Sequence, residues 1–282
     1  MKIKTMMAGR NRYKIAYKNY ISVMWNIYIR KVKNKIKVIF HNENSTYLDP
    51  ALAMNYAGLI ANKNIHIDDL CSDSNNIKFI YNGKNVTLEN GIGDVGVVFG
   101  NEDYNFLEVE KEIVIDIGAN IGDSPIYFAL NNAKKVIALE PYPYSYNKAL
   151  KNIKNNNIEE KIILLNAGYG QDGITKVDPN FENTTGSDLK SFTVGIDIKT
   201  LSLKTLLNAY HIDMAVLKMD CEGCEYNLLK EDNDTLRKFK RIQIEYHYGY
   251  KKLKEKLEGA GFTVTYFNLM KRMGFIYAKS NV

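Results

Sequence analysis

The eight residues from Asp116 to Asp123 have the types and spacing that most clearly suit ligand binding, in the order Asp-Ile-Gly-Ala-Asn-Ile-Gly-Asp. They follow an apolar segment typical of a buried strand and precede a segment typical of a helix. Gly118 and Gly122 let the backbone approach a ligand closely, and a helix N-terminus offers N–H groups to an anion. The spacing differs from the G-x-G-x-x-G pattern of dinucleotide enzymes, so a pyrophosphate is not the expected ligand.

The charge of this turn suggests a different ligand. The carboxylate of Asp116 suits an ammonium group, and the N–H groups at the helix start suit a carboxylate. The methionine end of S-adenosylmethionine has both groups. We therefore predict S-adenosylmethionine as the cofactor, bound by the turn residues Asp116, Gly118, Asn120, Gly122, Asp123 and Ser124.

Two further positions suit the nucleoside part of the same ligand. Glu140 ends the next predicted strand, where a carboxylate accepts hydrogen bonds from ribose hydroxyls, and Pro141 follows it. Asn166 and Ala167 end the third predicted strand, where we expect contact with the adenine. The alternative for Asn166 is a polar turn residue without a ligand.

A second acidic turn, Lys218-Met-Asp-Cys-Glu-Gly-Cys-Glu225, follows another apolar strand. Ligands of open α/β sheets bind beyond the carboxyl ends of the strands, so Asp220 and Glu222 are candidates to remove the acceptor's proton or to hold the sulfonium. The alternative is a helix start with acids placed against its dipole. Cys221 and Cys224 have C-x-x-C spacing but no second pair, so we expect buried small residues and no metal site.

Glu245 and His247 end the strand after that. Alternation along a strand places both on one side, near the same edge of the sheet. The ordinary pKa of histidine lies near neutral pH, so His247 is a candidate general base, and a structural, hydrogen-bonded histidine is the alternative. The predicted catalytic residues are Asp220, Glu222 and His247.

Alternating strands and helices must position these turns. We expect strands over residues 112–117, 135–139, 161–166, 215–220 and 241–246, and helices over 124–132, 145–154, 201–210 and 250–259. Such alternation predicts a parallel sheet with right-handed crossovers. Two last strands, 262–267 and 275–278, suit antiparallel pairing, and residues 170–199 are interpreted as an insertion above the sheet edge.

The first part of the chain has a different composition. Residues 1–40 contain eleven Lys and Arg and no acid, whereas the rest has 27 basic and 32 acidic residues, so a net charge of +6 divides into +11 and −5. An apolar stripe at helical spacing predicts a helix over residues 12–36. A helix over 51–61, a hairpin over 77–88 and a strand over 95–99 follow. We predict an N-terminal extension, 1–100, and a ligand-binding domain, 101–282.

Three alternatives fit the basic stripe of residues 12–36. It docks on its own domain or on a second copy in a homo-oligomer, it lies on a membrane surface, or it contacts nucleic acid. The sparse cysteines and the absence of a signal-peptide pattern favour a cytoplasmic protein, peripheral at a membrane in the second alternative. No apolar run reaches membrane-spanning length.

The combination of Asp116–Asp123, Glu140-Pro141, Lys218–Glu225 and Glu245 with His247 resembles the FkbM family of S-adenosylmethionine-dependent methyltransferases. The resemblance covers about residues 95–280. It implies a class I, Rossmann-like α/β fold with a seven-stranded, mostly parallel sheet whose last strand is antiparallel. It also implies O-methylation of a hydroxyl-bearing small molecule or glycan, such as a sugar or glycolipid. Asn166 departs from the Asp that many class I enzymes have there.

Two other functions remain open at this level. The basic residues of positions 1–40 suit an RNA methyltransferase. However, the acidic turn at Asp220–Glu222 adds negative charge where a phosphate backbone would pass. The other alternative is a protein that binds S-adenosylmethionine without turnover.

Overall fold

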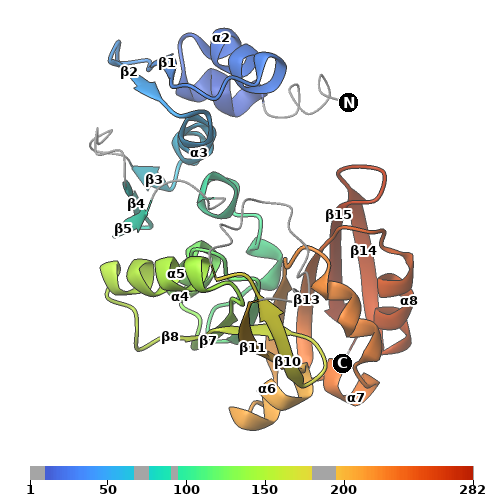
Figure 1. The fold of residues 1–282 in the computed structure, drawn as a ribbon. Helices are drawn as coiled ribbons and strands as arrows, with labels where there is room; N and C mark the ends of the chain where they lie inside the picture. Colours follow the sequence, from blue (N-terminus) through green and yellow to red (C-terminus); the bar gives the residue numbers. More distant parts are fainter. Residues whose placement is uncertain (1–9, 67–75, 90–94, 180–194, 282) are drawn as a thin grey trace. The chain divides into compact units, whose positions relative to one another are not determined.

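The computed structural model describes residues 10–66, 76–89, 95–179 and 195–281. The chain divides into two compact units, Met1–Asp103 and Tyr104–Val282. Figure 1 shows the elements of each unit.

The second unit is built on one seven-stranded sheet. Its strand order is β14-β15-β13-β12-β6-β7-β8, with bounds β6 Ile113–Ile117, β7 Lys135–Leu139, β8 Ile162–Leu165, β12 Ala215–Met219, β13 Phe239–Tyr246, β14 Phe262–Asn268 and β15 Gly274–Ser280. Neighbouring strands from β13 to β8 are parallel, and β15 is antiparallel to both β13 and β14. The expected α/β fold, mostly parallel with an antiparallel last strand, is confirmed.

The register of this sheet brings the predicted turns together. Asp116 of β6 pairs with Ala138 of β7 on one side and with Lys218 of β12 on the other. Because parallel strands end at the same edge, the turns after β6, β7 and β12 all leave the sheet at its carboxyl end.

Helices complete this unit (Figure 1): α4 Asp123–Leu130, α5 Pro143–Asn155, α6 Leu203–Ala209, α7 Asn233–Leu236, α8 Lys251–Gly259 and the 3-10 helices η3 Asn105–Leu107 and η4 Cys224–Lys230. Pro143 starts α5, where a missing N–H costs nothing, and the hydroxyl of Ser202 accepts from the N–H of Thr205 to cap α6. Leu206 of α6, Leu253 of α8 and the inward residues of β12 and β13 share one buried core.

The segment interpreted as an insertion is partly a small sheet. Strands β9 Ala167–Tyr169, β10 Gly173–Val177 and β11 Ile196–Leu201 pair in the order β10-β11-β9. Positions 180–194 lie outside the described residues.

In the first unit, the prediction of one helix over residues 12–36 is wrong. Residues 10–16 are helical, but Tyr17 forms a β-bridge with Phe40, and the chain turns before α2 Tyr20–Met24 and the π-helix η1 Trp25–Arg30. Residues 36–39 form β1 Ile36–Ile39, which pairs with β2 Ser45–Leu48. The apolar stripe therefore belongs to separate elements, because the isolated bridge from Tyr17 to Phe40 interrupts the helix.

Exposure also varies along the stripe, within the elements as well as between them. Tyr13 and Tyr17 are fully buried, whereas Ile21 is 68% exposed and Trp25 is 50% exposed. The membrane-surface role of residues 12–36 stays a prediction. In the described part of the chain, no helix has the length and apolar character needed to cross a bilayer.

The other expectations for this unit have mixed outcomes. The predicted helix is α3 Pro50–Ala61, and the predicted hairpin is β4 Asn76–Tyr81 and β5 Lys84–Glu89, with β3 Ile65–His66 beside β4. Asn82 and Gly83 both have positive φ, as a tight hairpin turn requires.

The strand expected over residues 95–99 is wrong, because the segment is the π-helix η2 Gly96–Gly100. Its glycines lie against α3: a Cβ on Gly58 would meet the carbonyl oxygen of Gly96 at 2.4 Å, and one on Gly100 would meet the carbonyl carbon of Gly58 at 2.4 Å. The valines favoured a strand, but this close backbone packing between two helices determines the structure.

Candidate active site

The turn after β6 and the turn after β12 touch through their backbones. Gly118 has φ +83°, and a Cβ there would lie 1.9 Å from the carbonyl oxygen of Asp220. The N–H of Asp220 donates to the carbonyl of Ile117 at 3.0 Å. Glycine is thus required at position 118 by the close approach of the two turns.

Asp116 and Lys218 form a fully buried ion pair behind these turns. Their carboxylate oxygen and Nζ are 2.9 Å apart, and the two side chains are 0% and 2% exposed. The hydroxyl of Ser124 donates to the other carboxylate oxygen at 2.7 Å, and Nζ of Lys218 donates to the carbonyl of Gly118 at 2.6 Å. Burial raises the pKa of Asp116, while the charge of Lys218 opposes that rise. The ammonium group beside Asp116 is therefore that of Lys218.

Glu140 lies directly after β7 and is 1% exposed. Its Oε2 accepts from the N–H of Asn120 at 2.8 Å, and its Oε1 accepts from the N–H of Tyr142 at 2.9 Å. Burial raises the pKa of Glu140 to about 7, although the backbone donors at Tyr142 and Asn120 oppose the shift. Glu140 thus links the turn after β6 to the turn after β7.

The start of α4 adds a third buried acid. Gly122, with φ +87°, precedes the helix, and Asp123 is its first residue. Oδ1 of Asp123 accepts from the N–H of Ser124 at 3.0 Å, and burial raises the pKa of Asp123 to about 6.

Asn166 lies between β8 and β9, and its amide has a structural role. Nδ2 donates to the carbonyl of Glu140 at 2.9 Å and to that of Pro141 at 3.1 Å. Ala167 is 3% exposed and pairs with Lys199 of β11. The structure thus gives Asn166 the task of fixing the turn that carries Glu140, and its contact with adenine stays a prediction.

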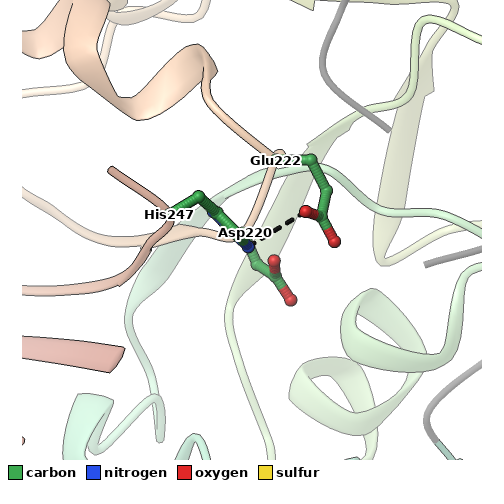
Figure 2. A group of neighbouring side chains, drawn as sticks. All are labelled: Asp220, Glu222 and His247. Atoms are coloured by element: carbon green, nitrogen blue, oxygen red, sulfur yellow. Dashed lines mark ion pairs between the residues drawn. The ribbon is translucent and has the colours of Figure 1, made fainter. Parts of the chain in front are cut away.

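The three predicted catalytic side chains converge at the carboxyl ends of β12 and β13. Figure 2 shows Asp220, Glu222 and His247 directed toward one another, with the ion pair between His247 and Glu222 dashed. Nε2 of His247 lies 3.0 Å from Oε2 of Glu222 and 4.0 Å from Oε1 of Glu245. One ligand atom of each of the three residues in Figure 2 lies within 4.8 Å of the others.

Glu225, at the start of η4, holds His247 in place. It is 0% exposed, and its Oε1 lies 3.1 Å from Nδ1 of His247 and accepts from the backbone N–H of the same residue at 3.0 Å. Its Oε2 accepts from the N–H of Gly223 at 2.7 Å. Burial alone lowers the pKa of His247, but the hydrogen bond and charge of Glu225, with the charges of Glu222 and Asp220, outweigh burial and raise it to about 9.

The expectation that Cys221 and Cys224 are only small buried residues is wrong. They form a disulfide, with their Cα atoms 5.5 Å apart. Glu222 lies inside the bridged segment and has φ +55°. The tight turn through Gly223, φ +118°, brings the two thiols together, and the bond removes the cysteine-based argument for a reducing compartment.

Sequence reasoning missed the roles of Lys218 and Glu225. A lysine inside an otherwise apolar strand indicates a buried cation, which needs an acidic partner. Asp116, in another apolar strand, was the matching candidate. Nothing comparable marks Glu225, because its partner His247 lies 22 residues further along the chain.

Comparison with known proteins assigns a family to this arrangement. Residues 116–277, more than half of the chain, match the family described as the methyltransferase FkbM domain. The match begins at Asp116 and includes both turns and the segment ending in His247.

Single proteins similar to this chain have low sequence identity to it. Uncharacterized protein 158B of Sulfolobus islandicus rod-shaped virus 1 is 28% identical over 144 residues, 51% of this chain and 66% of that protein, so slightly less than two thirds of its length is matched. Among solved structures, an rRNA methylase from Streptococcus thermophilus has a TM-score of 0.41 at 15% identity, covering 65% of this chain and 95% of that one. The METTL16 MTase domain has a TM-score of 0.47 at 16% identity, covering 87% of both chains.

Proposed function

Since the chain belongs to the FkbM methyltransferase family, we propose that it takes a methyl group from S-adenosylmethionine and transfers it to a hydroxyl of a sugar, glycolipid or related metabolite. The observation that carries the cofactor assignment is the buried carboxylate of Glu140, hydrogen-bonded to the N–H of Asn120 in the turn after β6.

The charges around the turns after β6 and β7 fit the proposed cofactor. The buried carboxyl groups of Asp116, Asp123 and Glu140 lie with one buried ammonium, that of Lys218. The site is therefore short of positive charge, and burial raises the pKa of each of the three acids. The proposed ligand carries two positive groups, a sulfonium and an ammonium, and one negative group, a carboxylate. Its net positive charge would supply the charge that the site lacks.

Two groups of residues would hold this ligand. Glu140 would accept from the ribose hydroxyls, and the turn from Gly118 to Ser124 would face the methionine end. Asp116 acts as a positioning residue: it fixes Lys218, whose Nζ holds the carbonyl of Gly118 and so the shape of the turn. Asn166 supports the adenine side by fixing the backbone after Glu140, and Ala167 follows it.

S-adenosylmethionine supplies a methyl group on a sulfonium that leaves readily, so the protein must chiefly align the acceptor oxygen. A hydroxyl also loses its proton as the new bond forms. The proposal assigns this task to the acidic cluster of Asp220, Glu222 and His247, which lies beside the cofactor turn through the contact of Gly118 with Asp220.

An uncharged, hydroxyl-rich acceptor suits the charge of this cluster. Glu222 and Glu245 both lie near His247, and Asp220 is only partly buried. Such local negative charge repels a phosphate backbone and leaves sugar hydroxyls unaffected.

Cofactor binding is tested by calorimetry of the full chain with S-adenosylhomocysteine. We expect 1:1 binding, weakened about 10-fold or more in Glu140→Gln. Asp234→Asn, which removes a 91% exposed carboxylate from α7, is the control and keeps the affinity of the unmodified chain. If correctly folded protein fails to bind S-adenosylhomocysteine, the proposal is contradicted.

The acceptor is tested by incubating the protein with methyl-labelled S-adenosylmethionine and fractionated cell extract. Label in the glycolipid, polysaccharide or small-metabolite fraction supports the proposed O-methylation. Label only in the RNA fraction, lost when residues 1–40 are removed, would instead establish an RNA methyltransferase. Binding without label in any fraction would favour a protein without turnover.

A further inference from the structure

The acidic cluster has the composition of a metal-ligand set. Two carboxylate oxygens and one imidazole nitrogen, from Asp220, Glu222 and His247, lie within 4.8 Å of one another. Donors bound to one ion at about 2.1 Å can be at most about 4.2 Å apart. Small side-chain rotations therefore bring the three atoms to coordination distance.

The setting of His247 independently points to a ligand. Its side chain is 9% exposed, and Nε2 has no hydrogen-bond partner among the described residues, although the oxygen of Glu222 is 3.0 Å away. The other ring nitrogen lies 3.1 Å from the buried carboxylate of Glu225. A histidine that binds a metal through one nitrogen almost always donates from the other to such a carboxylate, which fixes the ring.

We propose that Asp220, Glu222 and His247 bind a divalent transition-metal ion of the Mn²⁺ type, with Glu225 orienting the histidine ligand. Carboxylate oxygens suit Mg²⁺ and Mn²⁺, whereas imidazole nitrogen is a poor partner for Mg²⁺. The mixed set therefore favours a transition ion over Mg²⁺. This departs from the sequence analysis, which predicted no metal site.

Three protein ligands leave further coordination positions open. The role of the ion rests on the proposed function: it takes the acceptor's hydroxyl oxygen as an additional ligand and lowers its pKa. The O–H bond then breaks and its proton passes to a carboxylate oxygen of the cluster that does not bind the ion. The O–C bond forms, and the C–S bond breaks with its electron pair staying on sulfur.

The site is tested with MnCl₂ on the full chain after treatment with EDTA, by following the electron paramagnetic resonance signal of free Mn²⁺. We expect one bound ion per chain and a loss of affinity of at least 10-fold in Asp220→Asn and in His247→Gln. Glu245→Gln is the matched control, since it removes one nearby negative charge without removing a proposed ligand. It should change affinity less than 3-fold. An equal concentration of MgCl₂ should not displace the ion.

The outcomes separate the two proposals. Each variant is also titrated with S-adenosylhomocysteine, whose retained binding shows that the domain is folded. If S-adenosylhomocysteine binds but Mn²⁺ does not at 1 mM, roughly the weak end of protein metal sites, the metal proposal is overturned and the methyltransferase proposal stands. Equal losses in Asp220→Asn and Glu245→Gln also overturn it, because they indicate general attraction by negative charge. If Mn²⁺ binds and S-adenosylhomocysteine does not, the metal site stands and the proposed function fails.

Discussion

The turns after β6 and β12 meet at one edge of the sheet, but the candidate cofactor-binding acids on the β6 side are more deeply buried than the candidate catalytic acids on the β12 side. On the β6 side, Asp116 and Glu140 are almost completely buried, and their oxygens are engaged by Lys218 and by backbone N–H groups. On the β12 side, Glu225 is buried as well and holds His247, but Asp220 is partly buried and Glu222 is 22% exposed. The first arrangement is fixed by folding, and the second keeps carboxylates accessible to a partner.

This difference divides the edge into a rigid binding side and an open reacting side. Changes on the β6 side should lower stability and cofactor binding together. Changes at Asp220 or Glu222 should affect methyl transfer while the fold stays nearly as stable.

The largest effect is expected where the two sides touch. Gly118→Ala places a Cβ 1.9 Å from the carbonyl of Asp220 and strains a positive φ, so one turn must move. We expect a loss of about 4 kcal/mol or more in unfolding free energy and undetectable binding of S-adenosylhomocysteine. Urea unfolding followed by circular dichroism, with calorimetry, measures both.

Gly261→Ala is the control, because Gly261 has φ +100° with nothing within 4 Å of a Cβ. Strain alone should cost about 1–3 kcal/mol and leave binding intact. Similar losses in both variants would mean that contact between the turns is unimportant.

The next largest effect concerns the buried ion pair. Lys218→Met leaves Asp116 buried without its cation, which should cost about 3–5 kcal/mol in urea unfolding. Adding Asp116→Asn should restore part of this loss. Lys240→Met removes the cation of a half-exposed pair with Glu112 and should cost less than about 1 kcal/mol. Equal costs would contradict the rigid character of the β6 side.

Glu140 should give stability a pH dependence. Burial raises its pKa from 4.5 to about 7, so the folded protein holds a proton that the unfolded chain releases. The contribution of this group to stability is complete below about pH 4.5 and falls as pH rises to about 7, by roughly 3 kcal/mol. Urea unfolding at pH 5 and pH 8 should show this fall in the unmodified chain and a smaller one in Glu140→Gln. Parallel profiles would show that Glu140 is not protonated near neutral pH.

The smallest effect on folding is expected on the open side. Asp220→Asn should change unfolding free energy by less than about 1 kcal/mol, because the side chain is partly exposed. Binding of S-adenosylhomocysteine should change less than 3-fold, whereas methyl transfer should fall on the order of 100-fold. A large loss of stability would place Asp220 with the rigid acids.

The sequence predicted most of the second unit because its signals are local. The strand 135–139 agrees with β7 at both ends, and apolar runs between turn residues marked the other central strands. The first unit was harder, since its helix 12–36 and strand 95–99 had the right local spacing but were overruled by distant partners, Phe40 and Gly58.

In the candidate site, too, the sequence did not predict contacts between residues that are distant along the chain. The positions of Glu140, Asp220 and His247 follow from strand ends, so their meeting at one edge was predictable. The bond from Lys218 to the carbonyl of Gly118 joins residues 100 positions apart, and the bond between Glu225 and His247 spans 22. Only the folded sheet reveals such pairings.

The bridge between Cys221 and Cys224 makes this edge of the sheet dependent on the oxidation state of two thiols. It closes the backbone around Glu222 into a small covalent ring, so the carboxylate can adjust mainly by turning about its own side-chain bonds. Reduction of the bond would open that ring. The oxidised and reduced forms of the protein therefore differ in how firmly the backbone holds Glu222 at this edge.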